Sequence, residues 1–136
     1  MMDTFAAIEE YATSKFDVVH EEPFMLGLEV PVGDSGRRQS VFLAELQSPD
    51  GKRFLRVETT VAPLARHDSE KCLRVNLMLR TGYLAVGDME GVAFLKLCEN
   101  MMYNSLTVEA LDYMVHHLAE LGDKIEVTLN KGGDWF

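Results

Sequence analysis

The sequence predicts an α+β domain in which helices pack on an antiparallel sheet. Apolar residues recur with helical spacing near the start, in the middle and at the end of the chain. Between these segments, short apolar runs are separated by tight turns that contain glycine, proline or aspartate. Strands joined by short turns pair antiparallel, so the helices are expected on one face or at the ends of the sheet.

The first predicted element is a helix over residues 3–15, with Asp3 or Thr4 as its N-cap. Its apolar positions follow helical spacing at Phe5, Ile8 and Ala12. Residues 16–20 are expected to be a short extended piece that ends near Pro23.

Three runs then read as strands. Residues 24–32 form an apolar run with Pro31 near its end, which favours an edge strand. Residues 39–47 are apolar on both faces, and residues 54–61 return antiparallel after a Ser-Pro-Asp-Gly turn. Period-two alternation in this last strand predicts an inward set of Leu55, Val57, Thr59 and Val61.

A second helix is predicted from Asp68 or Ser69 to about Arg80, with Gly82 as its C-cap. Residues 83–86 and 92–97 then form a hairpin, and residues 100–105 a loop.

The last helix is capped by Thr107, and residues 130–136 are expected to be a loose tail. Its apolar face consists of Val108, Leu111, Val115, Leu118, Gly122, Ile125 and Leu129. The predicted order is therefore α-β-β-β-α-β-β-α in one domain, residues 1–136. Trp135 and Phe136 in the tail favour docking on the domain or on a partner.

The net charge of −9 disfavours nucleic acid and anionic membrane surfaces as partners. Residues 1–36 carry −7, residues 37–80 carry +4 and residues 81–136 carry −6. A basic middle between acidic ends is complementary inside one fold or across a dimer. The interpretation that we prefer is three solvated faces, because exposed ion pairs stabilise little.

The sequence predicts a cytoplasmic protein. No apolar run approaches the ~20 residues that cross a bilayer, and the N-terminus lacks the pattern of a signal peptide. The two cysteines, Cys72 and Cys98, belong to no C-x-x-C motif and are expected to be buried free thiols.

The histidines and carboxylates suggest little chemistry, so we expect no enzyme, no cofactor and no metal. Glu109, Asp112 and His116 share one polar sector of the last helix, and a metal there is the alternative. A solvated helix face is the preferred interpretation. The sequence contains no nucleophile elbow, phosphate-binding loop or dinucleotide-binding fingerprint.

Asn76 is the unusual polar residue of the middle helix, because it lies within an apolar arc on the helical wheel. A buried amide without partners costs ~1–3 kcal/mol. The preferred interpretation is a hydrogen bond to a neighbouring backbone group. The alternative is a register-setting role at a subunit contact.

Four segments together resemble a known superfamily. They are Leu73-Arg74-Val75-Asn76, Gly82-Tyr83-Leu84-Ala85-Val86, Gly91-Val92-Ala93-Phe94-Leu95 and Leu106-Thr107-Val108-Glu109-Ala110-Leu111. The chain is similar to type III secretion chaperones of the Tir-chaperone class and to the related YbjN proteins. The resemblance covers nearly the whole chain by architecture and about half of it by residue pattern. It implies a homodimer without enzymatic activity that holds a non-globular segment of a partner protein.

Such a partner segment is held on apolar patches or added to a strand edge. The strands at 24–30 and 39–47 are the candidate edge, and the methionines of the 100–105 loop the candidate patch. The expected partner-binding residues are Leu26, Leu28, Val41, Leu43, Met101 and Met102. The expected dimer-interface residues are Leu73, Asn76, Leu77, Leu111, Val115 and Leu118.

Three functions follow as hypotheses. The first is a secretion-chaperone-like protein that binds a peptide segment. The second is a YbjN-like regulatory or assembly factor that binds a folded partner. The third is a small-ligand or metal-dependent enzyme that uses Glu109, Asp112 and His116.

Overall fold

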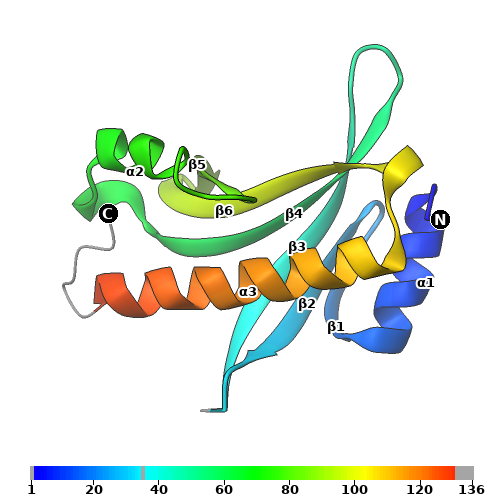
Figure 1. Cartoon of the computed structure of the whole chain (residues 1–136), viewed down its shortest axis with the longest axis horizontal. Coiled ribbons are helices and arrows are strands. Elements are labelled where there is room, and N and C mark those ends of the chain that lie inside the picture. The colour runs from blue at the N-terminus through cyan, green and yellow to red at the C-terminus, as the bar shows by residue number, and fades with distance from the viewer. Residues whose placement is uncertain (1, 35, 131–136) are drawn as a thin grey trace.

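The computed structural model describes residues 2–34 and 36–130, which form three α-helices and one six-stranded sheet (Figure 1). The helices are α1 (Phe5–Lys15), α2 (Ser69–Val75) and α3 (Val108–Asn130), and the 3-10 turns are η1 (Leu64–Arg66) and η2 (Tyr103–Ser105). The strands are β1 (Asp17–Glu22), β2 (Met25–Val32), β3 (Arg37–Gln47), β4 (Arg53–Pro63), β5 (Tyr83–Met89) and β6 (Val92–Met102).

The predicted α+β class is confirmed, with one more strand than expected. All neighbours pair antiparallel in the order β1-β2-β3-β4-β6-β5. The extra strand is β1, where only a short extended piece was predicted. Five of its six residues are exposed. Its sequence therefore lacks the alternation of apolar and polar residues that predicts a half-buried strand.

The three helices begin at N-cap residues that the sequence predicts. Thr4 Oγ1 accepts a hydrogen bond from the backbone N–H of Ala7 at 3.1 Å, and Thr107 Oγ1 accepts one from Ala110 at 3.1 Å. The Asp68 carboxylate likewise accepts from the backbone N–H of Glu70 at 2.9 Å. These caps satisfy N–H groups that have no partner within the helix.

The core lies between the sheet and α3, which crosses the inner face and contacts β2, β3, β4 and β6 (Figure 1). The predicted inward set of β4 is confirmed, since all four side chains are buried. Gly122 marks a close approach of α3 to the sheet. A Cβ on Gly122 would lie 2.7 Å from Cγ2 of Thr59, closer than side chains pack.

The strand at 24–32 is not an edge strand as predicted, because β1 pairs with one side of β2 and β3 with the other. The β1 ladder stops at the Asp17–Glu29 pair, so Pro31 lies beyond the part of β2 that β1 covers. Proline is tolerated there because its missing N–H removes no ladder hydrogen bond on that side.

The second hairpin turns at Glu90 and Gly91, which both have positive φ, as a two-residue turn with the right twist requires. Its strands are longer than predicted, and β6 runs on to Met102 through the first half of the expected 100–105 loop. Trp135 and Phe136 lie outside the described residues.

Candidate functional site

The predicted edge for a partner segment is wrong. Leu26, Leu28, Val41 and Leu43 are completely buried. They point to the inner face of two interior strands, where α3 covers them, so they offer nothing to a partner. Met101 is half-buried against the core, and of this set only Met102 is clearly exposed.

Half of the predicted dimer interface is wrong for the same reason. Leu111, Val115 and Leu118 are completely buried in the core of the chain itself. The helical periodicity identified the face of α3 correctly, but that face packs on the sheet rather than on a second subunit.

The segment around α2 does expose apolar side chains. The helix ends at Val75, not near Arg80, and its C-cap is Asn76 rather than Gly82. Leu73, Leu77 and Met78 are 66%, 91% and 73% exposed. We call these three residues the α2 apolar surface.

The expected hydrogen bond of the Asn76 amide to a neighbouring backbone group is confirmed. Its Nδ2 donates to the backbone oxygen of Leu84 at 3.2 Å, and its Oδ1 accepts from the backbone N–H of Leu84 at 2.7 Å. Leu84 belongs to β5, the strand at the end of the sheet. The amide therefore takes the place of a further strand at this point of an edge that would otherwise present free main-chain groups.

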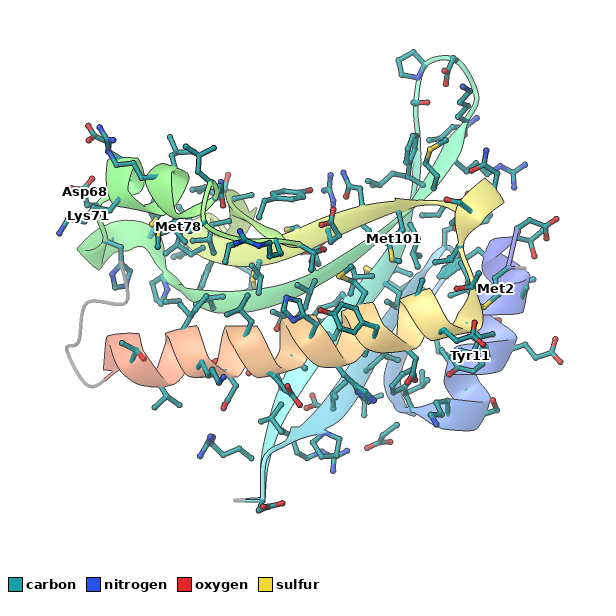
Figure 2. All side chains as sticks on the ribbon, viewed as in Figure 1. Met2, Tyr11, Asp68, Lys71, Met78 and Met101 are labelled. Atoms are coloured by element: carbon teal, nitrogen blue, oxygen red, sulfur yellow. The ribbon has the colours of Figure 1, made fainter. Side chains whose placement is uncertain are left out.

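Asp112 and His116, two residues of the predicted polar sector of α3, contact side chains from the first part of the chain. The Tyr11 hydroxyl donates to Asp112 at 3.1 Å, with α1 lying beside the first half of α3 (Figure 2). Burial, and then the Asp112 carboxylate, raise the pKa of Tyr11. His116 meets the ring of Phe16 edge-on, and His117 stacks on another ring of α3. The residues that the structure describes contain no group of three or more His, Cys, Asp or Glu that could hold a metal.

A cavity that was not predicted from the sequence forms where β3 and β4 separate. Their ladder runs from the Gln47–Arg53 pair to the Phe42–Glu58 pair and stops there. In Figure 1, β4 then bends away while β3 continues straight. Across the gap, Gln39 Nε2 donates to Thr59 Oγ1 at 2.8 Å and to the backbone oxygen of Thr60 at 3.2 Å. The Thr59 hydroxyl donates to the backbone oxygen of Ser40 at 2.6 Å.

We call this cavity the β3–β4 cleft, and it has a volume of about 580 Å³. Side chains from both faces of the sheet and from the end of α3 line it: Arg37, Arg38, Gln39, Ser40, Phe42, Thr60, Met89, Asp123, Glu126 and Val127. The volume falls within the ~300–1,000 Å³ of ordinary ligand sites. The one sequence signal was polar Thr59 in an inward position of β4.

The two arginines of the cleft are paired with carboxylates of the same chain. Arg37 binds Asp123 in two-pronged geometry, with Nε to Oδ1 at 3.1 Å and Nη2 to Oδ2 at 2.8 Å. Arg38 Nη2 donates to Asp17 at 3.1 Å. At these two arginines the basic middle of the sequence therefore complements its acidic ends inside one fold, rather than forming only a solvated face.

Glu126 is a carboxylate of the cleft whose charged form is disfavoured by its surroundings. Burial raises its pKa above the ordinary glutamate value, a hydrogen bond with Gln39 opposes that rise, and the nearby charge of Asp123 adds to it. The pKa of Glu126 stays raised because the loss of hydration outweighs the single hydrogen bond.

No known family model, curated protein or solved structure matches this chain.

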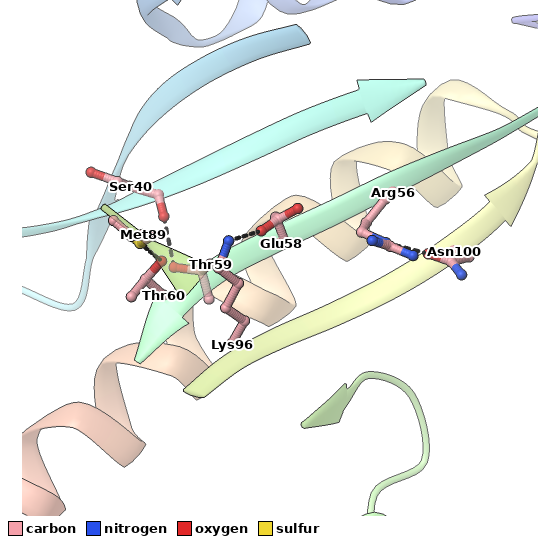
Figure 3. A network of polar contacts seen from close by, with 8 residues as sticks. All are labelled: Ser40, Arg56, Glu58, Thr59, Thr60, Met89, Lys96 and Asn100. Carbon is pink, nitrogen blue, oxygen red and sulfur yellow. Dashed lines mark hydrogen bonds and ion pairs between the residues drawn. The ribbon is translucent and has the colours of Figure 1, made fainter. Parts of the chain in front are cut away.

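The outer face of the sheet, opposite α3, holds a row of polar contacts (Figure 3). Lys96 Nζ donates to Glu58 at 3.0 Å with both side chains about four-fifths buried. Arg56 Nε donates to Asn100 Oδ1 at 3.0 Å. Beside them, burial raises the pKa of the Cys98 thiol to about 11, which keeps this cysteine protonated and unreactive at neutral pH.

Among the described helices, none has the length and apolar character needed to cross a membrane.

Proposed function

We propose that this chain is a non-catalytic protein-binding protein, similar in architecture to type III secretion chaperones of the Tir-chaperone class. The supporting observation is the α2 apolar surface. Among the eleven large apolar side chains that are clearly exposed in the described residues, three lie within this one short segment, Leu73, Leu77 and Met78. Clustered exposed apolar side chains of this kind mark protein interaction sites.

The α2 apolar surface is presented in a fixed position. Asn76 stands between Leu73 and Leu77, and its two hydrogen bonds tie the segment to the backbone of β5. A binding surface that is already ordered loses less conformational entropy on association. Burying each large apolar side chain contributes ~1.5–3 kcal/mol, so this surface favours contact with another polypeptide.

A second copy of the chain is the first candidate for that polypeptide. Leu73 and Leu77 are the members of the predicted dimer interface that remain exposed. A partner protein is then held by the dimer.

A cytoplasmic location fits the two buried free cysteines, since reducing compartments keep thiols free.

The experiment measures mass by light scattering at tens of micromolar protein for the wild type, Leu77→Asp and Val19→Asp. Leu77 is 91% exposed, so the substitution leaves the core intact and a change in mass reports association directly. Val19 on β1 is the matched control, an exposed apolar residue far along the sheet from α2. We expect a dimeric wild type, a monomeric Leu77→Asp variant and a dimeric control. A folded wild-type monomer contradicts the dimer.

Capture from the native host with the same three proteins as bait, followed by mass spectrometry, tests partner binding. We expect a partner that the wild type and Val19→Asp retain and that Leu77→Asp loses. Equal capture by all three proteins would show that the α2 apolar surface is not the binding site.

The second candidate is a YbjN-like regulatory or assembly factor that binds a folded protein. The observation that favours it is the row of polar side chains on the outer face, including the largely buried Lys96 and Glu58 (Figure 3). Ordered polar groups on a sheet face suit a folded surface better than a non-globular segment. Arg56→Glu would then abolish capture while leaving the dimer intact.

A further inference from the structure

The β3–β4 cleft combines apolar walls with a few polar groups, which is the usual composition of a small-ligand site. Phe42, Met89 and Val127 supply the apolar surface. Phe42 and Val127 are half-buried and Met89 is exposed, so each of them has surface that a ligand can cover. These walls suit an alkyl chain, and the ring of Phe42 also attracts a cation.

The charges around the cleft leave one carboxylate without a cation. Arg37 is bound to Asp123, and Arg38 is bound in the same way to a carboxylate of β1, Asp17. Glu126 is the remaining charged residue of the lining, and none of the described Lys, Arg and His side chains forms an ion pair with it. With Asp17 included, the cleft has one more negative charge than positive charges. A cationic ligand is therefore favoured over an anionic one.

The surroundings of Glu126 favour the approach of that cation. Burial and the charge of Asp123 raise the pKa of Glu126, and its hydrogen bond with Gln39 offsets only part of the rise. A positive charge beside a carboxylate stabilises the charged form. A bound cation would therefore supply what the folded chain does not give to Glu126.

Gln39 contributes a second acceptor at the same place. Its side chain lines the cleft and is only 5% exposed, with Nε2 donating to Thr59 and Thr60. Its Oε1 accepts no hydrogen bond from any of residues 2–34 and 36–130, and it is not closed off from solvent. A primary ammonium group has a positive charge and three N–H donors. It can therefore satisfy both Glu126 and Gln39 Oε1.

We propose that the β3–β4 cleft binds the ammonium group of a linear aliphatic amine, with the ammonium at Glu126 and Gln39 and the alkyl chain on the apolar walls. The amine is either a free small molecule or the lysine side chain of a partner. No residue of the α2 apolar surface lines the cleft, so this site is independent of the proposed protein binding.

The experiment is a titration followed by ¹H–¹⁵N NMR, which measures weak binding and locates it in the structure. The probes are hexylamine, 1-hexanol and hexanoate, which share an alkyl chain and differ in the charge of the head group. The proteins are the wild type, Glu126→Gln and Glu120→Gln. Glu120 is an exposed carboxylate of the same helix that does not line the cleft, so both variants lose one negative charge from α3.

We expect the wild type to bind hexylamine with a Kd of ~1 mM, the range for so small a ligand. The largest shifts should come from Gln39, Thr60 and Val127. Hexanol and hexanoate should bind at least ~10-fold more weakly, and Glu126→Gln should weaken hexylamine binding ~10-fold, because a charge-assisted hydrogen bond is lost. Glu120→Gln should bind hexylamine like the wild type.

Four results would overturn the proposal. No binding of hexylamine at ~10 mM would show that the cleft is not an amine site. Equal affinity for all three probes would show that only the apolar walls bind. Equal weakening in the two variants would show a general attraction of the amine to a chain of net charge −9. Shifts confined to residues away from the cleft would place the site elsewhere.

Nα-acetyl-lysine methylamide, titrated in the same way, distinguishes the two sources of the ammonium group. Affinity equal to that of hexylamine, with the same loss in Glu126→Gln, assigns the cleft to a lysine side chain of a partner. Affinity at least ~10-fold lower than that of hexylamine assigns it to a free amine.

Discussion

The close approach of α3 to β4 predicts that Gly122→Ala destabilises the protein, although alanine is the better helix former. In the helix interior this change alone would stabilise by ~1 kcal/mol. At this position, however, the new Cβ would lie 2.7 Å from Cγ2 of Thr59, a completely buried side chain. Either α3 or β4 must shift to relieve that contact.

The size of the effect follows from these two opposing contributions. Overpacking a core by one methyl group costs ~1–3 kcal/mol. Subtracting the gain in helix propensity leaves a net loss of about 1 kcal/mol in the free energy of unfolding. In a chain of this length that loss lowers Tm by ~4 °C. Urea and thermal unfolding, followed by circular dichroism, measure both quantities.

Thr59→Ser is the matched background, because serine lacks only the methyl group that Gly122→Ala would meet. Its hydroxyl keeps the geometry for the bonds to Ser40 and Gln39. The next neighbour of the new Cβ is Gln39 Nε2 at 3.5 Å, an ordinary contact. In this background we expect Gly122→Ala to stabilise by ~1 kcal/mol, a coupling energy of about 2 kcal/mol. An effect of equal sign and size in both backgrounds would refute the reasoning.

Two further predictions concern Asn76 and Glu126. Asn76→Ala removes both bonds to the edge of β5 and should lower the free energy of unfolding in urea by ~2 kcal/mol. Asn76→Asp keeps an acceptor for the Leu84 N–H and should lose about half as much stability. Equal losses of stability in the two variants would contradict the conclusion that both hydrogen bonds contribute. Glu126→Gln should raise Tm at neutral pH, because the raised pKa of Glu126 means that folding disfavours its charged form. The stabilisation by Glu126→Gln grows as pH rises towards the pKa that Glu126 has in the folded protein. It vanishes below the ordinary pKa of ~4.3, where Glu126 is neutral in both the folded and the unfolded state. A pH-independent gain in a Tm series would count against it.

The local chemistry of the chain was predictable where neighbouring residues decide the structure. Thr4 and Thr107 cap their helices because short polar side chains satisfy the first free N–H groups. The inward set of β4 follows from alternation alone. The early end of α2 was not visible, because apolar residues continue at helical spacing past Val75. Only the position of β5 shows that the Asn76 amide has a partner outside the helix.

The candidate site could not be predicted because it depends on strand order. A hydrophobic pattern shows that Leu28 and Val41 share a buried face, but not that their strands lie inside the sheet. The β3–β4 cleft depends on where two paired strands part, and residues distant in sequence form its walls. Gln39 and Thr59 bridge that gap, and nothing in their neighbours marks them as partners.

The parting of β3 from β4 leaves two halves of the sheet, β1-β2-β3 and β4-β6-β5, which are joined by the β3–β4 ladder from Phe42–Glu58 to Gln47–Arg53. A single helix, α3, contacts strands of both halves. We therefore expect substitutions under the middle of α3 to change the width of the opening without replacing any residue that lines it.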